Sequence, residues 1–187
     1  MTQAVIAYLL VAAFFAIELS IRQSGSARSL ETTDSDRGST LLIGASLGVA
    51  VILPPVLDFL GVGQIHLPAI SWLGLGIMLL GIGLRAWSMR VLGAFYSRRL
   101  RVTDRQVIVT QGPYGVIRHP GYLGSILFWV GFGLALANWI ATLVLALPML
   151  GVYIYRIRVE EAMLLTTFGD HYRQYCQHTW KLLPFLY

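Results

Sequence analysis

Charged residues are scarce in this sequence. Asp, Glu, Lys and Arg make up 12% of its 187 residues, whereas 56% are hydrophobic, and the mean hydropathy is +0.67. A soluble domain of this length needs roughly a quarter of its residues charged to cover its surface. The shortage excludes an ordinary soluble domain and indicates that lipid solvates much of the surface. We expect one membrane domain over residues 1–187.

Other chemical signatures are also missing. Cys176 is the single cysteine, which excludes an internal disulfide and a multi-cysteine zinc or iron–sulfur site. No two histidines have a metal-binding spacing such as H-E-x-x-H, so no metal is predicted. The absence of G-x-G-x-x-G, of a phosphate-binding loop and of strand–helix alternation excludes a Rossmann-type enzyme. The net charge of +5 does not predict a nucleic-acid partner, because basic residues in a membrane chain usually mark cytoplasmic loops.

Hydrophobic residues gather instead into five segments, each of which predicts a helix: Ala4–Leu19, Leu41–Leu60, Ile70–Leu84, Tyr122–Ala137 and Trp139–Tyr155. The third is long enough to span a bilayer only if it continues through Trp87 toward Arg90. No basic residue precedes the first segment, so we interpret it as an uncleaved helix and not as a signal peptide. The last two segments meet at Asn138 and predict a tight helical hairpin.

Proline and glycine refine this picture. Pro54 and Pro55 are expected to bend or end the second helix, and Pro148 to kink the fifth. Small residues allow helices to approach closely in membranes. Packing of this kind is predicted for the second and third segments from Gly44, Gly48, Gly74, Gly76, Gly81 and Gly83.

The basic residues predict the orientation. All 14 Lys and Arg residues fall within residues 22–37, 85–118 and 156–181. The connections over residues 61–68 and 137–139 contain none. With five spans, the three basic regions lie on one face, which the positive-inside rule makes cytoplasmic. We therefore expect the N-terminus outside and the C-terminus, with any active site among these regions, in the cytoplasm.

A first polar block precedes the fourth segment. Gly112-Pro113-Tyr114 and Arg118-His119-Pro120-Gly121-Tyr122 both contain prolines that fix turns. Pro120 suits the first turn of a helix, whose unpaired amides favour an anion nearby. The block is equally typical of interfacial anchoring, in which arginine and tyrosine side chains lie at headgroup depth.

A second polar block follows the fifth segment. Arg156 and Glu160 are four residues apart and share one helix face, while Glu161 turns away from it. Acidic residues where a helix leaves the membrane are costly unless a cation or polar ligand is near, although a surface ion pair is the alternative. Gly169 is expected to stop this helix and Asp170 to begin another, before a docking tail over residues 180–184.

These blocks together resemble the isoprenylcysteine carboxyl methyltransferase family, within a wider group that includes phospholipid N-methyltransferases. The resemblance covers about the C-terminal half of the chain. The matching residues, in order, are Gly112-x-Tyr114-x3-Arg118-His119-Pro120-x-Tyr122, Arg156-x3-Glu160-Glu161, Phe168-Gly169-x2-Tyr172-x2-Tyr175 and Leu183-Pro184.

Together with the five apolar segments, the resemblance predicts an all-α integral membrane bundle of about five transmembrane helices. Three of these lie in residues 1–90, and residues 91–187 form the cofactor-binding and catalytic half with a cytoplasmic C-terminal segment. The implied cofactor is S-adenosylmethionine. Arg156 matches the position that binds the acceptor's carboxylate, and Arg156 and Glu160 are the implied catalytic residues. The implied cofactor contacts are Gln106, Val107, Ile108, Val109, Tyr114, His119, Pro120, Gly121, Tyr122 and Glu160.

The methyl acceptor stays open at this point. A lipophilic, isoprenylcysteine-like acceptor would enter from the bilayer, and its carboxylate would need no general base because methyl transfer depends mainly on alignment. A phospholipid amine or a small thiol would need a base, for which His119 and Glu161 are candidates. Two further interpretations are an NADPH-dependent reductase of the sterol-reductase type and a non-catalytic membrane scaffold.

Overall fold

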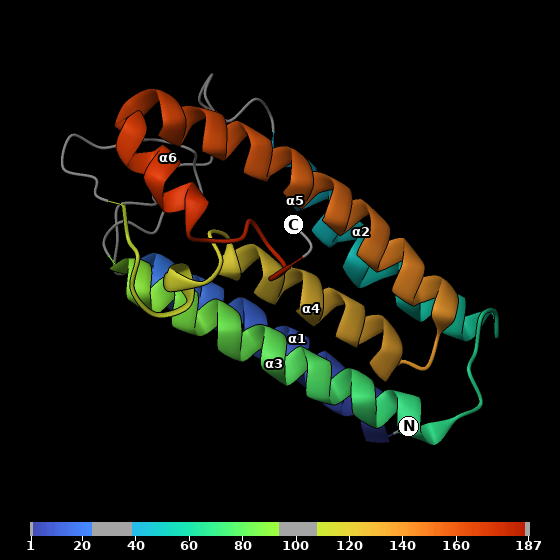
Figure 1. Ribbon diagram of the computed structural model, residues 1–187. Helices are drawn as coiled ribbons and strands as arrows, with labels where there is room; N and C mark the ends of the chain where they lie inside the picture. Colours follow the sequence, from blue (N-terminus) through green and yellow to red (C-terminus); the bar gives the residue numbers. More distant parts are fainter. Residues whose placement is uncertain (1, 24–38, 94–107, 186–187) are drawn as a thin grey trace.

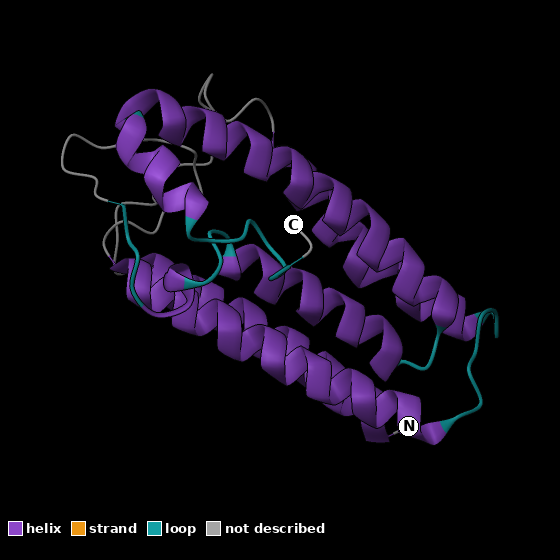
Figure 2. Cartoon of the chain, viewed as in Figure 1, coloured by secondary structure: helices purple, strands orange, loops and turns teal. Residues whose placement is uncertain are grey.

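The computed structural model describes residues 2–23, 39–93 and 108–185 (Figure 1). Within these ranges every regular element is a helix, as Figure 2 shows. The all-α prediction is therefore confirmed for the described residues. The elements are α1 Thr2–Gln23, α2 Ser39–Phe59, α3 Pro68–Leu92, the short 3-10 turn η3 Gly112–Gly115, α4 Pro120–Ala135, α5 Trp139–Phe168 and α6 Asp170–Gln177.

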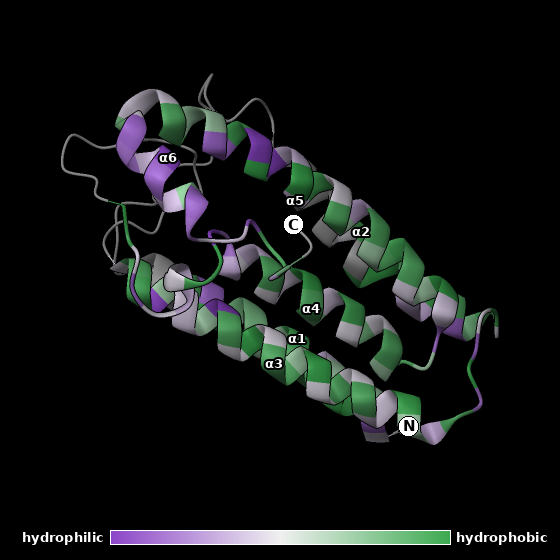
Figure 3. Cartoon of the chain, viewed as in Figure 1, coloured by the Kyte–Doolittle hydropathy of each residue, from purple (hydrophilic) through white to green (hydrophobic). Residues whose placement is uncertain are grey.

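Three of the described helices, α1, α3 and α5, are long and apolar enough to cross a membrane. The helix α4 is apolar but has only 16 residues. Figure 3 shows hydrophobic residues along the lengths of the helices and hydrophilic ones concentrated at the end of the bundle near α6. The chain is thus a helical membrane protein, whereas five spans remain a prediction.

Two helices continue past residues at which they could have ended. The helix α5 has 30 residues and continues past Tyr155, where the apolar run stops, to Phe168, so it ends at Gly169 as predicted. The helix α2 continues through Pro54 and Pro55 to Phe59. Of the two expected effects of these prolines, a bend or an end of the helix, the end is therefore contradicted. Backbone groups in lipid have no water to bind, which favours continued helix over an open chain. The helix α3 continues through Trp87 and Arg90 to Leu92, so it meets the length that spanning a bilayer required of it.

The turn between α4 and α5 is built on Asn138, as expected for a tight hairpin. Its side chain is buried. The Oδ1 atom accepts a hydrogen bond of 2.9 Å from the backbone N–H of Ala141, which caps the start of α5. The Nδ2 group donates at 2.7 Å to the carbonyl of Val62. One side chain therefore fixes the hairpin and ties it to the preceding connection.

Close packing of α3 on α4 depends on glycine. A Cβ atom added at Gly74 would lie 2.2 Å from the backbone nitrogen of Ala135, and one at Gly81 would lie 2.6 Å from the carbonyl oxygen of Gly124. The predicted close approach is confirmed at these two positions of α3. Open space surrounds three of the other glycines for which it was predicted, Gly48, Gly76 and Gly83.

The core of the bundle is aromatic and joins α1, α3 and α4. Phe14 of α1 stacks on Phe128 of α4 with ring centroids 4.3 Å apart. Trp129 meets both rings edge-on, and Met78 of α3 is fully buried in the same cluster. The helix α5 contacts α4 on one side and α2 on another. In Figure 1, α6 folds back from the end of α5 toward the start of α4.

Candidate functional site

The loop that precedes α4 and the C-terminal tail meet through their backbones. The N–H of Arg118 donates to the carbonyl of Trp180 at 2.8 Å, and the N–H of His119 donates to that of Lys181 at 3.1 Å. The N–H of Trp180 donates to Val116 at 3.0 Å in return. The predicted docking tail is therefore paired, over one short parallel bridge, with the loop that leads into α4.

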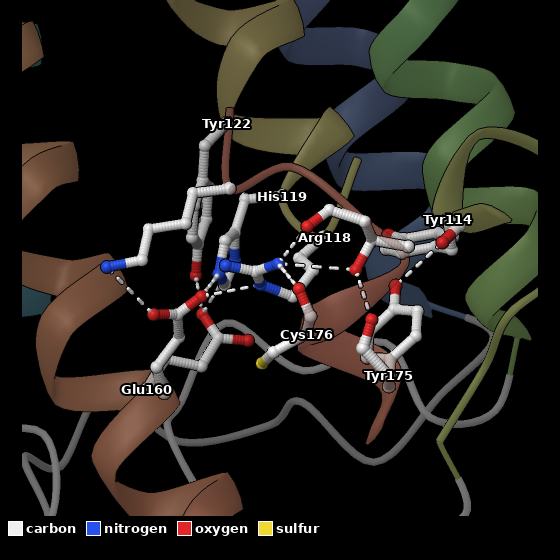
Figure 4. Close-up of polar contacts among 10 residues, drawn as sticks. Tyr114, Arg118, His119, Tyr122, Glu160, Tyr175 and Cys176 are labelled. Carbon is white, nitrogen blue, oxygen red and sulfur yellow. Dashed lines mark hydrogen bonds and ion pairs between the residues drawn. The ribbon is translucent and has the colours of Figure 1, made fainter. Parts of the chain in front are cut away.

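The hydroxyl of Tyr122 links α4 to α5 (Figure 4). It donates to Oε2 of Glu160 at 2.5 Å and accepts from Nε of Arg156 at 2.9 Å. Arg156 is 3% exposed, whereas the Glu160 side chain is 26% exposed. Three residues predicted separately from two sequence blocks thus form one hydrogen-bonded chain. We call Tyr122, Arg156 and Glu160 the Glu160 cluster.

Aromatic rings surround this cluster. The rings of His119 and Tyr122 are nearly parallel, with centroids 5.5 Å apart and an interplanar angle of 4°. The ring of Tyr153, a residue of α5, lies 5.0 Å from the ring of Tyr122. The guanidinium of Arg156 lies 5.9 Å from the Tyr122 centroid. Arg156 is therefore held by a hydrogen bond and a cation–π contact to one residue. Tyr153 was missed because it lies inside an apolar run.

Glu161 contacts a different set of side chains. Its carboxylate lies 2.8 Å from Nε of Arg118, 3.3 Å from Nζ of Lys181 and 3.4 Å from Nε2 of His119. It turns away from Arg156, as the spacing predicted, yet its side chain is only 15% exposed. Consecutive helix residues point about 100° apart, and here both directions are occupied by other elements. Glu161, Arg118 and Lys181 are named the Glu161 cluster.

Arg118 extends the Glu161 cluster to the C-terminal tail. Its Nη1 group donates to the carbonyl of Thr179, and also to Oγ1 of Thr179 and the carbonyl of Cys176, both at 3.2 Å. Burial alone would lower the pKa of Arg118, but the hydrogen bond and charge of Glu161 raise it above its usual value. The guanidinium therefore stays charged and joins α5, α6 and the tail.

Tyr114 lies apart from the Glu160 cluster. It is buried in η3, and Figure 4 shows it on the side away from Glu160. Its hydroxyl makes a long 3.5 Å contact to the carbonyl of Ser88 on α3. Its own carbonyl accepts a 2.7 Å hydrogen bond from the hydroxyl of Tyr175, whose pKa is raised to about 12 by burial. These contacts anchor η3 between α3 and α6.

The remaining predicted residues form three pairs. Gln106 and Val107 lie outside the described residues. Ile108 and Val109 are partly buried in the non-helical segment before η3. Pro120 and Gly121 form the first turn of α4. Among the described residues, no three His, Cys, Asp or Glu side chains gather as a candidate metal site.

One buried polar atom in the site has no hydrogen-bond partner among the described residues. Nε2 of His119 approaches Glu161 at 3.4 Å, but without the alignment of a hydrogen bond. The His119 side chain is 4% exposed, and its Nδ1 lies 3.9 Å from Glu160. A buried group of this kind calls for an additional polar partner. The Nε2 atom of His119 therefore retains hydrogen-bonding capacity for a further polar group.

Comparison with known proteins gives consistent matches. Residues 69–171, more than half of the chain, match the family model described as phospholipid methyltransferase. A probable protein-S-isoprenylcysteine O-methyltransferase of Oryza sativa subsp. indica is 30% identical over 63% of this chain and 62% of its own length. The protein-S-isoprenylcysteine O-methyltransferase of Schizosaccharomyces pombe is 35% identical over 54% of this chain and 44% of its own.

A solved structure has the same helical arrangement. The eukaryotic intramembrane Ras methyltransferase named isoprenylcysteine carboxyl methyltransferase matches with a TM-score of 0.61 and 26% identity. The match covers 82% of this chain and 55% of that one. The chain thus spans between about two fifths and three fifths of the length of these proteins.

Proposed function

Because this chain belongs to the phospholipid methyltransferase family, we propose that it is a membrane methyltransferase that uses S-adenosylmethionine to methylate a lipophilic, isoprenylcysteine-like carboxylate. The Glu160 cluster is the observation that carries the proposal. A buried arginine and a partly exposed carboxylate share one tyrosine hydroxyl where α4 begins and α5 leaves the apolar region. The names of the matched relatives and of the solved structure support the same reaction.

The residues present suit S-adenosylmethionine. The cofactor carries hydroxyl groups and a cationic centre, which a partly exposed carboxylate such as Glu160 would bind. His119 offers a buried ring nitrogen that makes no hydrogen bond among the described residues, although Glu161 lies 3.4 Å away, and the rings of His119 and Tyr122 offer flat surfaces. When bound, the cofactor supplies an activated methyl group. The residues proposed to hold it are Gln106, Val107, Ile108, Val109, Tyr114, His119, Pro120, Gly121, Tyr122 and Glu160.

Arg156 is proposed to orient the acceptor. A guanidinium pairs with a carboxylate through two parallel hydrogen bonds. The hydrogen bond from Nε of Arg156 to the Tyr122 hydroxyl fixes the plane of the guanidinium that would meet the acceptor. A carboxylate already carries the charge of its nucleophile, and alignment is then the main requirement for transfer. Arg156 and Glu160 are therefore the proposed catalytic residues, one for the acceptor and one for the cofactor.

The proposal includes five spans with the site on the cytoplasmic side. The basic residues of the described ranges occur near the end of α1, in the C-terminal halves of α3 and α5, in the loop before α4, and in α6 with its tail, all toward one end of the bundle. The opposite connections, residues 60–67 and 136–138, contain no Lys or Arg. The positive-inside rule then assigns the basic end to the cytoplasm. A polar cofactor would arrive from this side and a lipophilic acceptor from the bilayer.

A lipid amine is the second candidate acceptor. The description of the matching family favours it, and so does His119. An amine must lose a proton during methylation. The imidazole of His119 would accept that proton, whereas a carboxylate acceptor would not need a base.

One experiment separates these functions. Purified protein in lipid is supplied with radiolabelled S-adenosylmethionine and, in parallel, with a prenylcysteine analogue, phosphatidylethanolamine or a small thiol. We expect methyl incorporation into the prenylcysteine carboxylate, detected as a base-labile methyl ester. Incorporation into phosphatidylethanolamine alone would favour the lipid amine. Binding of NADPH without S-adenosylmethionine binding would indicate a reductase and contradict the proposal, and binding of neither would indicate a scaffold.

A further inference from the structure

A charged pair is buried among the apolar helices, outside both polar blocks. Glu18 of α1 and Nε of Arg85 of α3 form a hydrogen-bonded ion pair. Their side chains are only 4% and 13% exposed. Charged residues inside a membrane bundle are expensive and are usually retained for a function. The apolar packing of the same helices already joins α1 to α3 and α4. Holding these helices together therefore does not explain why a charged pair is buried between them.

Arg85 also reaches the start of α4. Its Nη1 group donates a 3.0 Å hydrogen bond to the carbonyl of Gly121. Gly121 lies between His119, the N-terminal cap of α4, and Tyr122, whose hydroxyl joins Arg156 to Glu160. A guanidinium is planar, so a carboxylate that fixes Nε also fixes the direction of Nη1. Glu18 thereby aims Arg85 at the turn that presents His119 and Tyr122.

From this geometry we propose that Arg85 and Glu18 are positioning residues for the methyl-transfer site, an inference that rests on the function proposed above. Arg85 holds the first turn of α4 through the Gly121 carbonyl, and Glu18 holds Arg85. The rings of His119 and Tyr122 depend on that turn for their stacked arrangement. Catalytic geometry is sensitive to displacements of about 1 Å, so loosening the turn would weaken cofactor binding.

The inference gives the N-terminal helix a part in the reaction. Glu18 lies outside residues 69–171, the range that matches the family model. The contact between α1 and the site therefore belongs to a part of the chain that the family match does not cover. Phe14 supports it from one turn away, because the guanidinium of Arg85 lies 5.7 Å from the Phe14 ring centroid.

Two variants separate positioning from general stability. Arg85→Lys keeps a charge beside Glu18 but has a single ammonium group in place of the guanidinium fork. The reversed pair Glu18→Arg/Arg85→Glu keeps an ion pair but places an acceptor where Gly121 needs a donor. Glu18→Gln, which still accepts a hydrogen bond, is a milder third variant. Arg173→Lys changes an exposed ion pair to Asp170 and is the matched control.

Three quantities are measured on each protein in lipid: the Kd of radiolabelled S-adenosylmethionine, kcat and KM, and hydrogen–deuterium exchange over residues 120–126. For Arg85→Lys and the reversed pair we expect Kd and KM to rise at least about fivefold with exchange faster over residues 120–126. The midpoint of thermal unfolding should stay near that of the wild type, and Arg173→Lys should change none of these quantities.

The outcomes distinguish the two proposals. Unchanged Kd and unchanged exchange in Arg85→Lys and the reversed pair would overturn the positioning role. A lower unfolding midpoint with normal Kd in the folded protein would also overturn it, because the pair would then serve stability alone. If the wild-type protein binds no S-adenosylmethionine, the proposed function fails. The exchange of residues 120–126 then decides by itself whether the pair holds the turn.

Discussion

Glu160 and Glu161 are adjacent in α5, yet their carboxylates belong to two regions with different partners. Glu160 accepts a hydrogen bond from one tyrosine hydroxyl, has Nδ1 of His119 3.9 Å away, and keeps a quarter of its side chain exposed. Glu161 lies against Arg118, His119 and Lys181 and is less exposed. A carboxylate surrounded by cations holds segments together, whereas one with an exposed edge can bind a ligand. Two neighbouring glutamates can therefore have different roles, Glu161 a structural one and Glu160 a chemical one.

The largest effect should come from removing Glu161. Its loss leaves Arg118 with a buried, uncompensated charge, so Glu161→Ala should lower the free energy of unfolding by about 3 kcal/mol. Thermal unfolding of the detergent-solubilised protein, followed by tryptophan fluorescence, measures this change. Glu161→Gln, which keeps an acceptor oxygen, is the control and should lose less. An Ala variant as stable as the wild type would show that the Glu161 cluster does not hold the tail.

Removing the charge of Glu160 should affect activity and not stability. Loss of a charge-assisted hydrogen bond to the cofactor should lower kcat/KM of Glu160→Gln about 100-fold. Initial rates with radiolabelled S-adenosylmethionine measure the loss, and the unfolding midpoint measures retention of the fold. A variant that is unstable but fully active per folded molecule would reverse the roles assigned to the two carboxylates.

A smaller loss is expected for Tyr122→Phe. The substitution keeps the stacked ring but removes the hydroxyl that donates to Glu160 and accepts from Arg156. One such bond corresponds to about a tenfold change in kcat/KM. Tyr175→Phe is a matched control, because its hydroxyl binds the Tyr114 carbonyl away from the Glu160 cluster. Equal losses in the two variants would contradict a special role for Tyr122.

The smallest effect should appear at the single cysteine. Burial raises the pKa of the Cys176 thiol, although the charge of Arg118 partly opposes this. Because the thiolate is the reactive form, alkylation at pH 8 should be slower than for an exposed cysteine. Loosening the tail with Glu161→Ala should speed alkylation about threefold, with Glu160→Gln unchanged. Mass spectrometry after timed alkylation tests this, and equal rates in both variants would contradict the separation.

Sequence patterns predicted the local parts of this molecule well. Apolar runs placed the described membrane helices, and Asn138 and Gly169 were assigned correctly as helix boundaries. Gly169 adopts a φ of 53°, which suits glycine at the end of a helix. The helix continues to this predicted stop although hydrophobicity ends at Tyr155. The charged residues beyond it stay helical because several find partners on other elements.

Long-range pairings were harder to predict. Tyr122, Arg156 and Glu160 were found because they lie in recognisable blocks. Arg85 and Glu18 are 67 residues apart in separate apolar helices, and no local spacing indicates that they meet. The contacts of Glu161 with the tail depend on how the chain folds back after α6. Such contacts follow from tertiary packing, which the periodicity of residues along one helix does not predict.

The uninterrupted length of α5 determines how deep in the bilayer Glu160 would lie. Trp139 begins this helix and is 53% exposed, as aromatic residues at a membrane interface commonly are. Glu160 follows 21 residues later, which corresponds to about 32 Å of helix. The hydrocarbon layer is about 30 Å thick. In the proposed orientation, α5 therefore holds its carboxylate at the opposite boundary of the bilayer, at the level where the polar end of a lipid-anchored molecule would lie.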